Sequence, residues 1–175
     1  MKFCDKPFTS AYLAPNGEVW PCGWMHCVMG NLYKQNLDEV WTSEAAEQAR
    51  RSILDGSFAF CRETSCPYME RNELPDLTEE ELRARAVPLE TPANITIAND
   101  RTCNIACTSC RTCIQAPDAE EREKIDSALE RLLPFANQAK MVSMNGQGEF
   151  LANPSFLRFL NKLRPVHKDF KETLI

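Results

Sequence analysis

The sequence of 175 residues lacks an excess of basic charge and any long apolar run. Its formal net charge is -5 at pH 7, so a general affinity for the nucleic-acid backbone is not expected. No stretch approaches the roughly 20 apolar residues that span a bilayer. No apolar segment follows the lysine near the N-terminus, as a secretory signal would require. These absences favour a cytoplasmic protein without membrane or nucleic-acid partners.

Cysteine, by contrast, is abundant, with nine in the chain. Thiols stay reduced in the cytoplasm, and an odd count leaves one thiol unpaired in any disulfide scheme. Metal or cluster ligation is therefore expected rather than disulfides. The cysteines form two groups separated by a long gap: Cys4, Cys22, Cys27, Cys61 and Cys66 come first, and Cys103, Cys107, Cys110 and Cys113 follow.

Residues 1–70 are expected to form a small cysteine-rich α+β module. Apolar residues alternate around Asn16 and Gly17, and this pair predicts a β-hairpin because both central residues of a type I′ turn need positive φ. Residues 43–54 are predicted to form a helix with Ser43 as its N-cap. This order of elements can bring the early cysteines close to the pair that follows the helix.

The rest of the chain is expected to contain a linker and an α/β unit. Residues 71–93 are rich in charge and proline and are interpreted as the linker. Residues 94–175 then alternate predicted strands and helices, at 94–99, 118–135, 140–146, 155–163 and 171–175. Such alternation predicts parallel β/α architecture. Since the sequence stops within a predicted strand, we expect a fragment of a longer fold.

The loop after the first of these strands contains the pattern C-x3-C-x2-C, formed by Cys103, Cys107 and Cys110. Each iron of a 4Fe–4S cluster needs one external ligand, so three thiolates leave one iron open to a non-protein ligand. With Cys113 as a fourth ligand the site would be closed, at a spacing close to that of bacterial ferredoxins. Structural zinc sites pair two cysteines with a distant second pair, which fits the first cysteine group better.

The next predicted strand also ends in a candidate site. Gly146 and Gly148 allow a close approach of the backbone to a ligand, and Glu149 can accept a hydrogen bond from an amino group. Since β/α folds place their sites at the carboxyl ends of strands, the two loops are predicted to share a ligand pocket.

This combination resembles the radical S-adenosylmethionine enzymes. The resemblance implies that Cys103, Cys107 and Cys110 hold a 4Fe–4S cluster whose open iron binds the amino and carboxylate groups of S-adenosylmethionine. The implied cofactor-binding residues are Gly146, Gln147, Gly148 and Glu149, with Gln147 in place of the first glycine of the family's Gly-Gly-Glu turn, and Ser109, where the family often has an aromatic residue near the adenine.

The resemblance also implies a fold and an activity. Residues 94–175 would be the first half of a partial parallel (β/α) barrel, without the later strands that complete the cofactor contacts. The expected reaction is reductive cleavage of S-adenosylmethionine to a 5′-deoxyadenosyl radical, which takes a hydrogen atom from a peptide, protein or small-molecule substrate. An electron donor such as ferredoxin or flavodoxin is the implied partner. The fragment alone is expected to be inactive if it lacks those strands.

Residues 1–70 resemble the SPASM module, which holds an auxiliary iron–sulfur cluster in many of these enzymes. The pattern includes Pro7-Phe8 shortly after the first cysteine, Pro21-Cys22, Gly30-Asn31-Leu32 and Cys66-Pro67. The resemblance implies that the auxiliary ligands are Cys4, Cys22, Cys61 and Cys66. His26 and Cys27 fit less clearly, and either could replace a ligand. The module usually follows the barrel, whereas here it comes first.

Two other functions remain open on the sequence alone. An iron–sulfur electron carrier with two closed clusters would require Cys113 as a ligand and would not respond to S-adenosylmethionine. A zinc-binding interaction module would contain zinc and no acid-labile sulfide.

Overall fold

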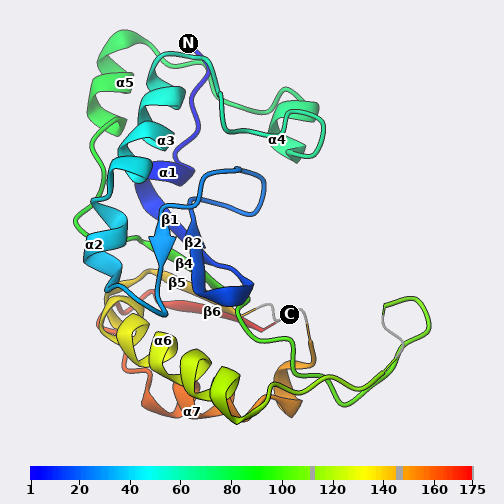
Figure 1. Cartoon of the computed structure of the whole chain (residues 1–175). Coiled ribbons are helices and arrows are strands. Elements are labelled where there is room, and N and C mark those ends of the chain that lie inside the picture. Colours follow the sequence, from blue (N-terminus) through cyan, green and yellow to red (C-terminus); the bar gives the residue numbers. More distant parts are fainter. Residues whose placement is uncertain (111–112, 145–147, 175) are drawn as a thin grey trace.

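Six strands form one mixed sheet in the order β3-β2-β1-β4-β5-β6 in the computed structural model, which describes residues 1–110, 113–144 and 148–174 (Figure 1). The strands are β1 (Ser10–Leu13), β2 (Glu18–Trp20), β3 (Gly30–Asn31), β4 (Asn94–Ile97), β5 (Met141–Met144) and β6 (Lys171–Leu174). β2 is antiparallel to both of its neighbours, β1 and β3, whereas β1, β4, β5 and β6 are parallel. The predicted alternation of strands and helices from residue 94 onward is confirmed.

The predicted hairpin is formed by β1 and β2. Asn16 and Gly17 have φ angles of 66° and 77°, within a one-turn 3-10 helix, η1 (Pro15–Gly17). The Asn31 side-chain amide donates to the carbonyl of Asn16 at 2.8 Å, and the Leu32 amide donates to the carbonyl of Gly17 at the same distance. The turn is therefore held by Asn31 of β3 and by Leu32, which follows β3, as well as by its own backbone preference.

The helices are α1 (Lys6–Thr9), α2 (Leu37–Trp41), α3 (Glu44–Leu54), α4 (Pro67–Glu70), α5 (Glu79–Arg85), α6 (Ala119–Gln138) and α7 (Pro154–Lys162), with a second 3-10 turn, η2 (Phe150–Ala152). The predicted N-cap of α3 is confirmed, because the Ser43 hydroxyl accepts a hydrogen bond from the amide of Ala46 at 3.1 Å. Each helix in the described ranges is too short or too polar to cross a membrane.

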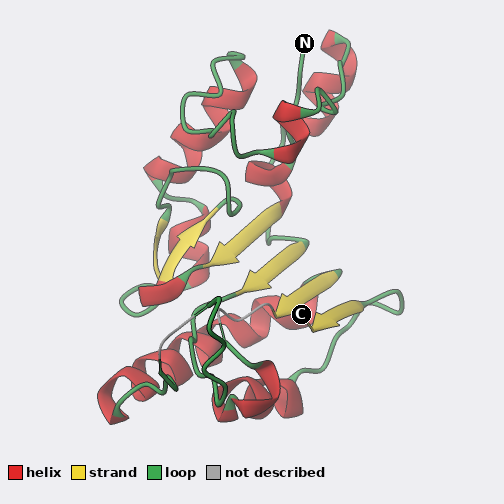
Figure 2. Cartoon of the chain, turned by 90° about the vertical axis from the view of Figure 1, so that its right-hand side faces the viewer, coloured by secondary structure: helices red, strands yellow, loops and turns green. Residues whose placement is uncertain are grey.

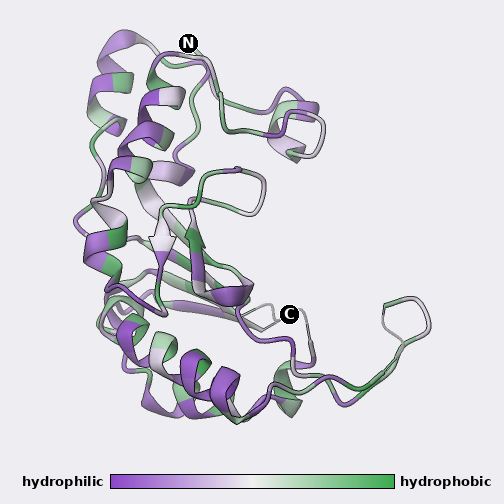
Figure 3. Ribbon diagram, viewed as in Figure 1, coloured by the Kyte–Doolittle hydropathy of each residue, from purple (hydrophilic) through white to green (hydrophobic). Residues whose placement is uncertain are grey.

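Helices α6 and α7 cover one face of the sheet (Figure 2). Their buried side chains pack with those of four strands in the larger hydrophobic core, which includes Leu13, Ile95, Ile125, Val142 and Phe156. α6 carries hydrophilic and hydrophobic residues along its length (Figure 3), as expected of a helix with one buried face. Parallel strands with helices on this face present the carboxyl ends of β4 and β5 side by side.

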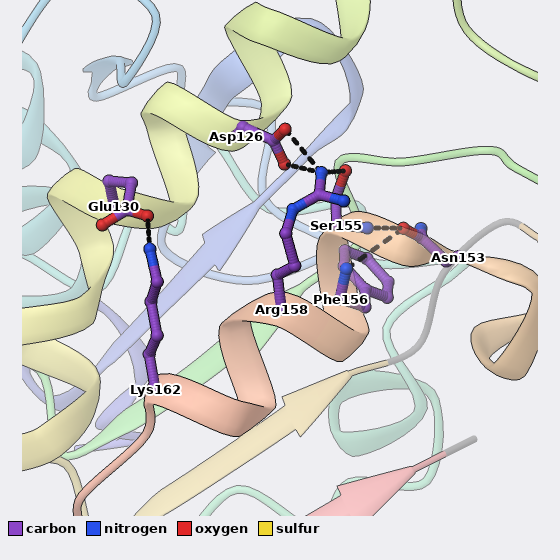
Figure 4. Close-up of polar contacts among 7 residues, drawn as sticks. All are labelled: Asp126, Glu130, Asn153, Ser155, Phe156, Arg158 and Lys162. Carbon is purple, nitrogen blue, oxygen red and sulfur yellow. Dashed lines mark hydrogen bonds and ion pairs between the residues drawn. The ribbon is translucent and has the colours of Figure 1, made fainter.

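Polar contacts hold α7 against α6 (Figure 4). The Arg158 guanidinium donates to Asp126 at 2.6 and 2.8 Å, and Lys162 pairs with Glu130 one turn further along. At the start of α7 the Asn153 side chain, 1% exposed, accepts from the amide of Ser155 at 3.0 Å. The ion pairs hold α7 against α6, and the cap fixes the start of α7 shortly after the loop that follows β5.

The sheet crosses the divisions expected from the sequence. β1 lies in the predicted module and β4 in the predicted α/β unit, yet Leu13 pairs with Ile97 in a parallel register. The expected linker also packs along the N-terminal part, where the amide of Leu77 donates to the carbonyl of Met1 at 3.0 Å. The sequence contains no local signal for the pairing of β1 with β4, because a long connection separates these two parallel strands.

Candidate functional site

Four thiols of the N-terminal part line one pocket: those of Cys4, Cys22, Cys61 and Cys66. Cys4 precedes α1, Cys22 follows β2, and the other two lie between α3 and α4. Backbone hydrogen bonds hold these segments together: the amide of His26 donates to Phe60 at 2.7 Å and the amide of Arg62 donates to Trp24 at 3.1 Å. The fold thus gathers the four cysteines that the SPASM resemblance implies as ligands.

The surroundings of these thiols are largely apolar. Pro7, Met25, Ile53 and Phe58 line the same pocket. Burial raises the pKa of Cys4 to about 11, and burial together with the charges of the other three cysteines raises the pKa of Cys61 to about 12. The thiols of Cys4 and Cys61 are therefore neutral near pH 7 in the metal-free chain, and metal binding would displace their protons.

The donor set fits a cluster of several irons. The ligands of an iron–sulfur cluster are distributed over its irons, so its four thiolates surround a common pocket instead of converging on one atom. Four cysteines around an apolar pocket provide that kind of donor set.

The other two candidate ligands of this region have different partners. Cys27 is 7% exposed and packs in the second hydrophobic core with Phe3 and Phe8, where its Sγ donates to the carbonyl of Ala45 at 3.3 Å. The His26 ring is exposed, and its Nδ1 lies 3.4 Å from a guanidinium nitrogen of Arg62. Both residues follow Cys22 closely in sequence, but neither is among the residues that line the pocket of the four thiols.

The second cysteine group lies on the long loop after β4, which extends away from the sheet (Figure 1). Cys103 is buried at the base of the loop, and its backbone exchanges two hydrogen bonds with Gln115, at 2.9 and 3.2 Å. The amide of Cys110 donates to the carbonyl of Cys107 at 2.9 Å, which places these two cysteines in one turn. Cys107, Ser109, Cys110 and Cys113 are all exposed.

The turn after β5 contacts the base of this loop. The amide of Glu149 donates to the carbonyl of Thr102 at 2.9 Å, and an added Cβ on Gly148 would lie 2.0 Å from the same oxygen. The carboxylate of Glu149 accepts from the amide of Leu151 at 3.4 Å. Gly146 and Gln147, the other predicted members of this turn, lie outside the described residues.

Sequence reasoning missed two buried polar residues at the end of β4. Asn99 and Asp100 are 3% and 1% exposed and come directly before the cysteine loop. The signal that could have identified them is a polar pair at the carboxyl end of an apolar strand, where β/α folds place functional side chains.

Comparison with known proteins bears on the N-terminal part of the chain. Neither curated proteins nor solved structures contain a match to this chain. The family model of SPASM, described as an iron–sulfur cluster-binding domain, matches residues 4–67, a segment that contains all four pocket cysteines. Residues 4–67 therefore form a SPASM iron–sulfur cluster-binding domain, of a kind that occurs in radical S-adenosylmethionine enzymes.

Proposed function

We propose that this chain is part of a radical S-adenosylmethionine enzyme whose cofactor binds between the loops after β4 and β5. The observation that carries the proposal is the contact of the Gly148-Glu149 turn with Thr102, directly before Cys103. Two loops with different parts of the family's cofactor motif therefore meet at the ends of adjacent parallel strands. The SPASM match supports the proposal, because such domains accompany these enzymes.

Each loop would have its own role. Cys103, Cys107 and Cys110 would hold a 4Fe–4S cluster, and Glu149 would accept hydrogen bonds from the amino group of S-adenosylmethionine. Gly146, Gln147 and Ser109 are proposed as further cofactor contacts on the resemblance alone. When bound and reduced, such a cluster supplies the electron that splits S-adenosylmethionine into methionine and a 5′-deoxyadenosyl radical, which removes a hydrogen atom from the substrate. The residues of this chain bind and orient the reactants.

The wider setting is part of the same proposal. β4, β5 and β6 with α6 and α7 would be the first part of a partial barrel, which their parallel order supports. The cluster in the SPASM domain would hold a peptide, protein or small-molecule substrate or pass electrons. A ferredoxin or flavodoxin in the cytoplasm would supply the electrons.

Anaerobic EPR of the reconstituted, dithionite-reduced chain tests the cofactor site. We expect S-adenosylmethionine to change the spectrum of one cluster, and we expect Cys107→Ala to abolish that change. An unchanged spectrum from a wild-type chain with two clusters would contradict the proposal and favour a closed-cluster electron carrier. A purified chain that contains zinc and no acid-labile sulfide would favour the zinc-binding interaction module.

A matched pair of variants tests the auxiliary ligands. Cys61→Ser should lower the iron and sulfide content by one cluster, because Cys61 lines the pocket with three other thiols. Cys27→Ser should retain both clusters, since the Cys27 thiol donates to a backbone carbonyl in the core. Equal loss of iron in the two variants would contradict this assignment of ligands.

A further inference from the structure

The carboxylate of Asp100 is bound to the chain just ahead of the cysteine loop. Asp100 lies three residues after the end of β4 and is 1% exposed. Its Oδ1 accepts two hydrogen bonds from Thr102, from the amide at 2.8 Å and from the hydroxyl at 2.7 Å. Thr102 is itself 7% exposed. One buried oxygen therefore fixes both the backbone and the side chain of the residue that precedes Cys103.

Thr102 in turn carries the contact with the second loop. Its carbonyl accepts from the amide of Glu149 at 2.9 Å. The Gly148 backbone lies so close to this carbonyl that an added Cβ would be 2.0 Å from the oxygen and 2.8 Å from the carbon. A continuous set of contacts thus joins Asp100, Thr102 and the turn that contains Glu149.

Folding stability alone does not account for a carboxylate at this position. Within the part of the chain that the structure describes, Oδ2 of Asp100 is buried without a hydrogen-bond partner. A buried polar atom without a partner lowers the stability of the fold, and more so when the group is charged. The effect of Asp100 that the structure does show is that it orients Thr102.

We propose that Asp100 and Thr102 are positioning residues that set the distance between the cysteine loop and the Gly148-Glu149 turn. The inference rests on the proposed function, in which one cofactor is bound by both loops, through the cluster on one and through Glu149 on the other. A ligand held at two points loses affinity when those points move apart, and displacements of about 1 Å are enough to matter. Neither residue touches the cofactor in this proposal.

A test is available in two matched pairs of variants. Thr102→Val removes the hydroxyl at nearly constant shape, whereas Thr102→Ser retains it. Asp100→Ala removes the acceptor, whereas Asp100→Asn retains an Oδ1 that can accept from both Thr102 donors. The readout is the concentration of S-adenosylmethionine that gives half of its EPR change. We expect this concentration to rise about tenfold in Thr102→Val and Asp100→Ala, and the serine and asparagine variants to stay near wild type.

Two controls separate a positioning role from general damage. Iron and sulfide content should be unchanged in all four variants. In the metal-free chain the Glu149 amide should exchange its hydrogen faster in Thr102→Val than in wild type, while the amides of β4 and β5 keep their rates. Equal cofactor affinity in all variants would overturn the inference while leaving the proposed function intact. If the wild-type spectrum does not respond to S-adenosylmethionine, the proposed function itself fails.

Discussion

The single side chain of Arg50 connects three segments of the N-terminal part. It is 7% exposed, and its Nε donates to the carbonyl of Pro7 at 3.0 Å while Nη2 donates to that of Trp41 at 2.8 Å. The guanidinium carbon also lies 4.6 Å from the centre of the Trp41 ring. Burial lowers the pKa of Arg50, so the charge is retained against a desolvation penalty. α1 and α2 are thereby held against α3.

We expect Arg50→Lys to lower the free energy of unfolding by about 1–3 kcal/mol. Lysine keeps the charge, but its ammonium group cannot reproduce the planar fork that reaches two carbonyls and stacks on the indole. Denaturant unfolding of the metal-free chain measures the change.

Arg51→Lys provides the matched control. Arg51 is the next residue on α3, and its side chain is exposed. Within the described residues its one ion pair is with Glu47, at 3.1 Å. This change should alter stability by less than about 0.5 kcal/mol. Equal effects at the two positions would mean that the buried contacts of Arg50 add nothing.

At the scale of elements, local chemistry made much of the fold predictable. The Asn16-Gly17 turn and the Ser43 cap depend on neighbours within a few residues, so the sequence specifies them directly. The same holds for the alternation of strands and helices after residue 94. Pairing of β1 with β4 depends instead on packing between distant segments, for which sequence spacing contains no signal.

The candidate site shows the same difference between local and distant information. Cysteine spacing predicted the ligands of the second group, and the SPASM resemblance implied those of the first; the structure gathers Cys4, Cys22, Cys61 and Cys66 around one pocket. For the contact of Gly148 with Thr102, the sequence predicted only that the two loops follow adjacent strands. The orientation of Thr102 by Asp100 could not be predicted from the sequence, because it depends on which polar groups become buried when β4 joins the sheet.

The close approach of the loops after β4 and β5 leads to a prediction for Gly148→Ala. The new methyl group would lie 2.0 Å from the Thr102 carbonyl oxygen, so one loop has to move. Forcing a methyl group into such a contact costs about 1–3 kcal/mol of stability, and under the proposed function the displaced turn should lose its affinity for S-adenosylmethionine. EPR with added S-adenosylmethionine and denaturant unfolding measure the two effects.

Gly23→Ala is the corresponding control. The nearest atom to an added Cβ there is Tyr12 Cε2, at 4.0 Å, which is ordinary van der Waals contact. Cluster content and the response to S-adenosylmethionine should both remain at wild-type values. A Gly148→Ala variant that responds like Gly23→Ala would show that the loops have room to separate without consequence.

At the scale of the whole molecule, the SPASM domain and the α/β part share a hydrophobic core. Leu13 and Trp41 come from the first segment, Ile95, Ile125 and Val142 from the second, and all are buried in one cluster. The sheet is continuous across the same boundary. A core of this kind couples the stability of the two parts, because neither can unfold without exposing apolar surface of the other.

We therefore expect Leu13→Ala to destabilise both parts together. Leu13 is 1% exposed, and its truncation should cost about 2–5 kcal/mol. Amide hydrogen exchange should report the same loss in β1 and in β5, although β5 belongs to the α/β part and is not a neighbour of β1 in the sheet. Val87→Ala, at a side chain that is 68% exposed, should change neither. Faster exchange confined to β1 would instead mean two independently folding domains, and the sheet would then not fix the position of the four pocket cysteines relative to the cysteine loop after β4.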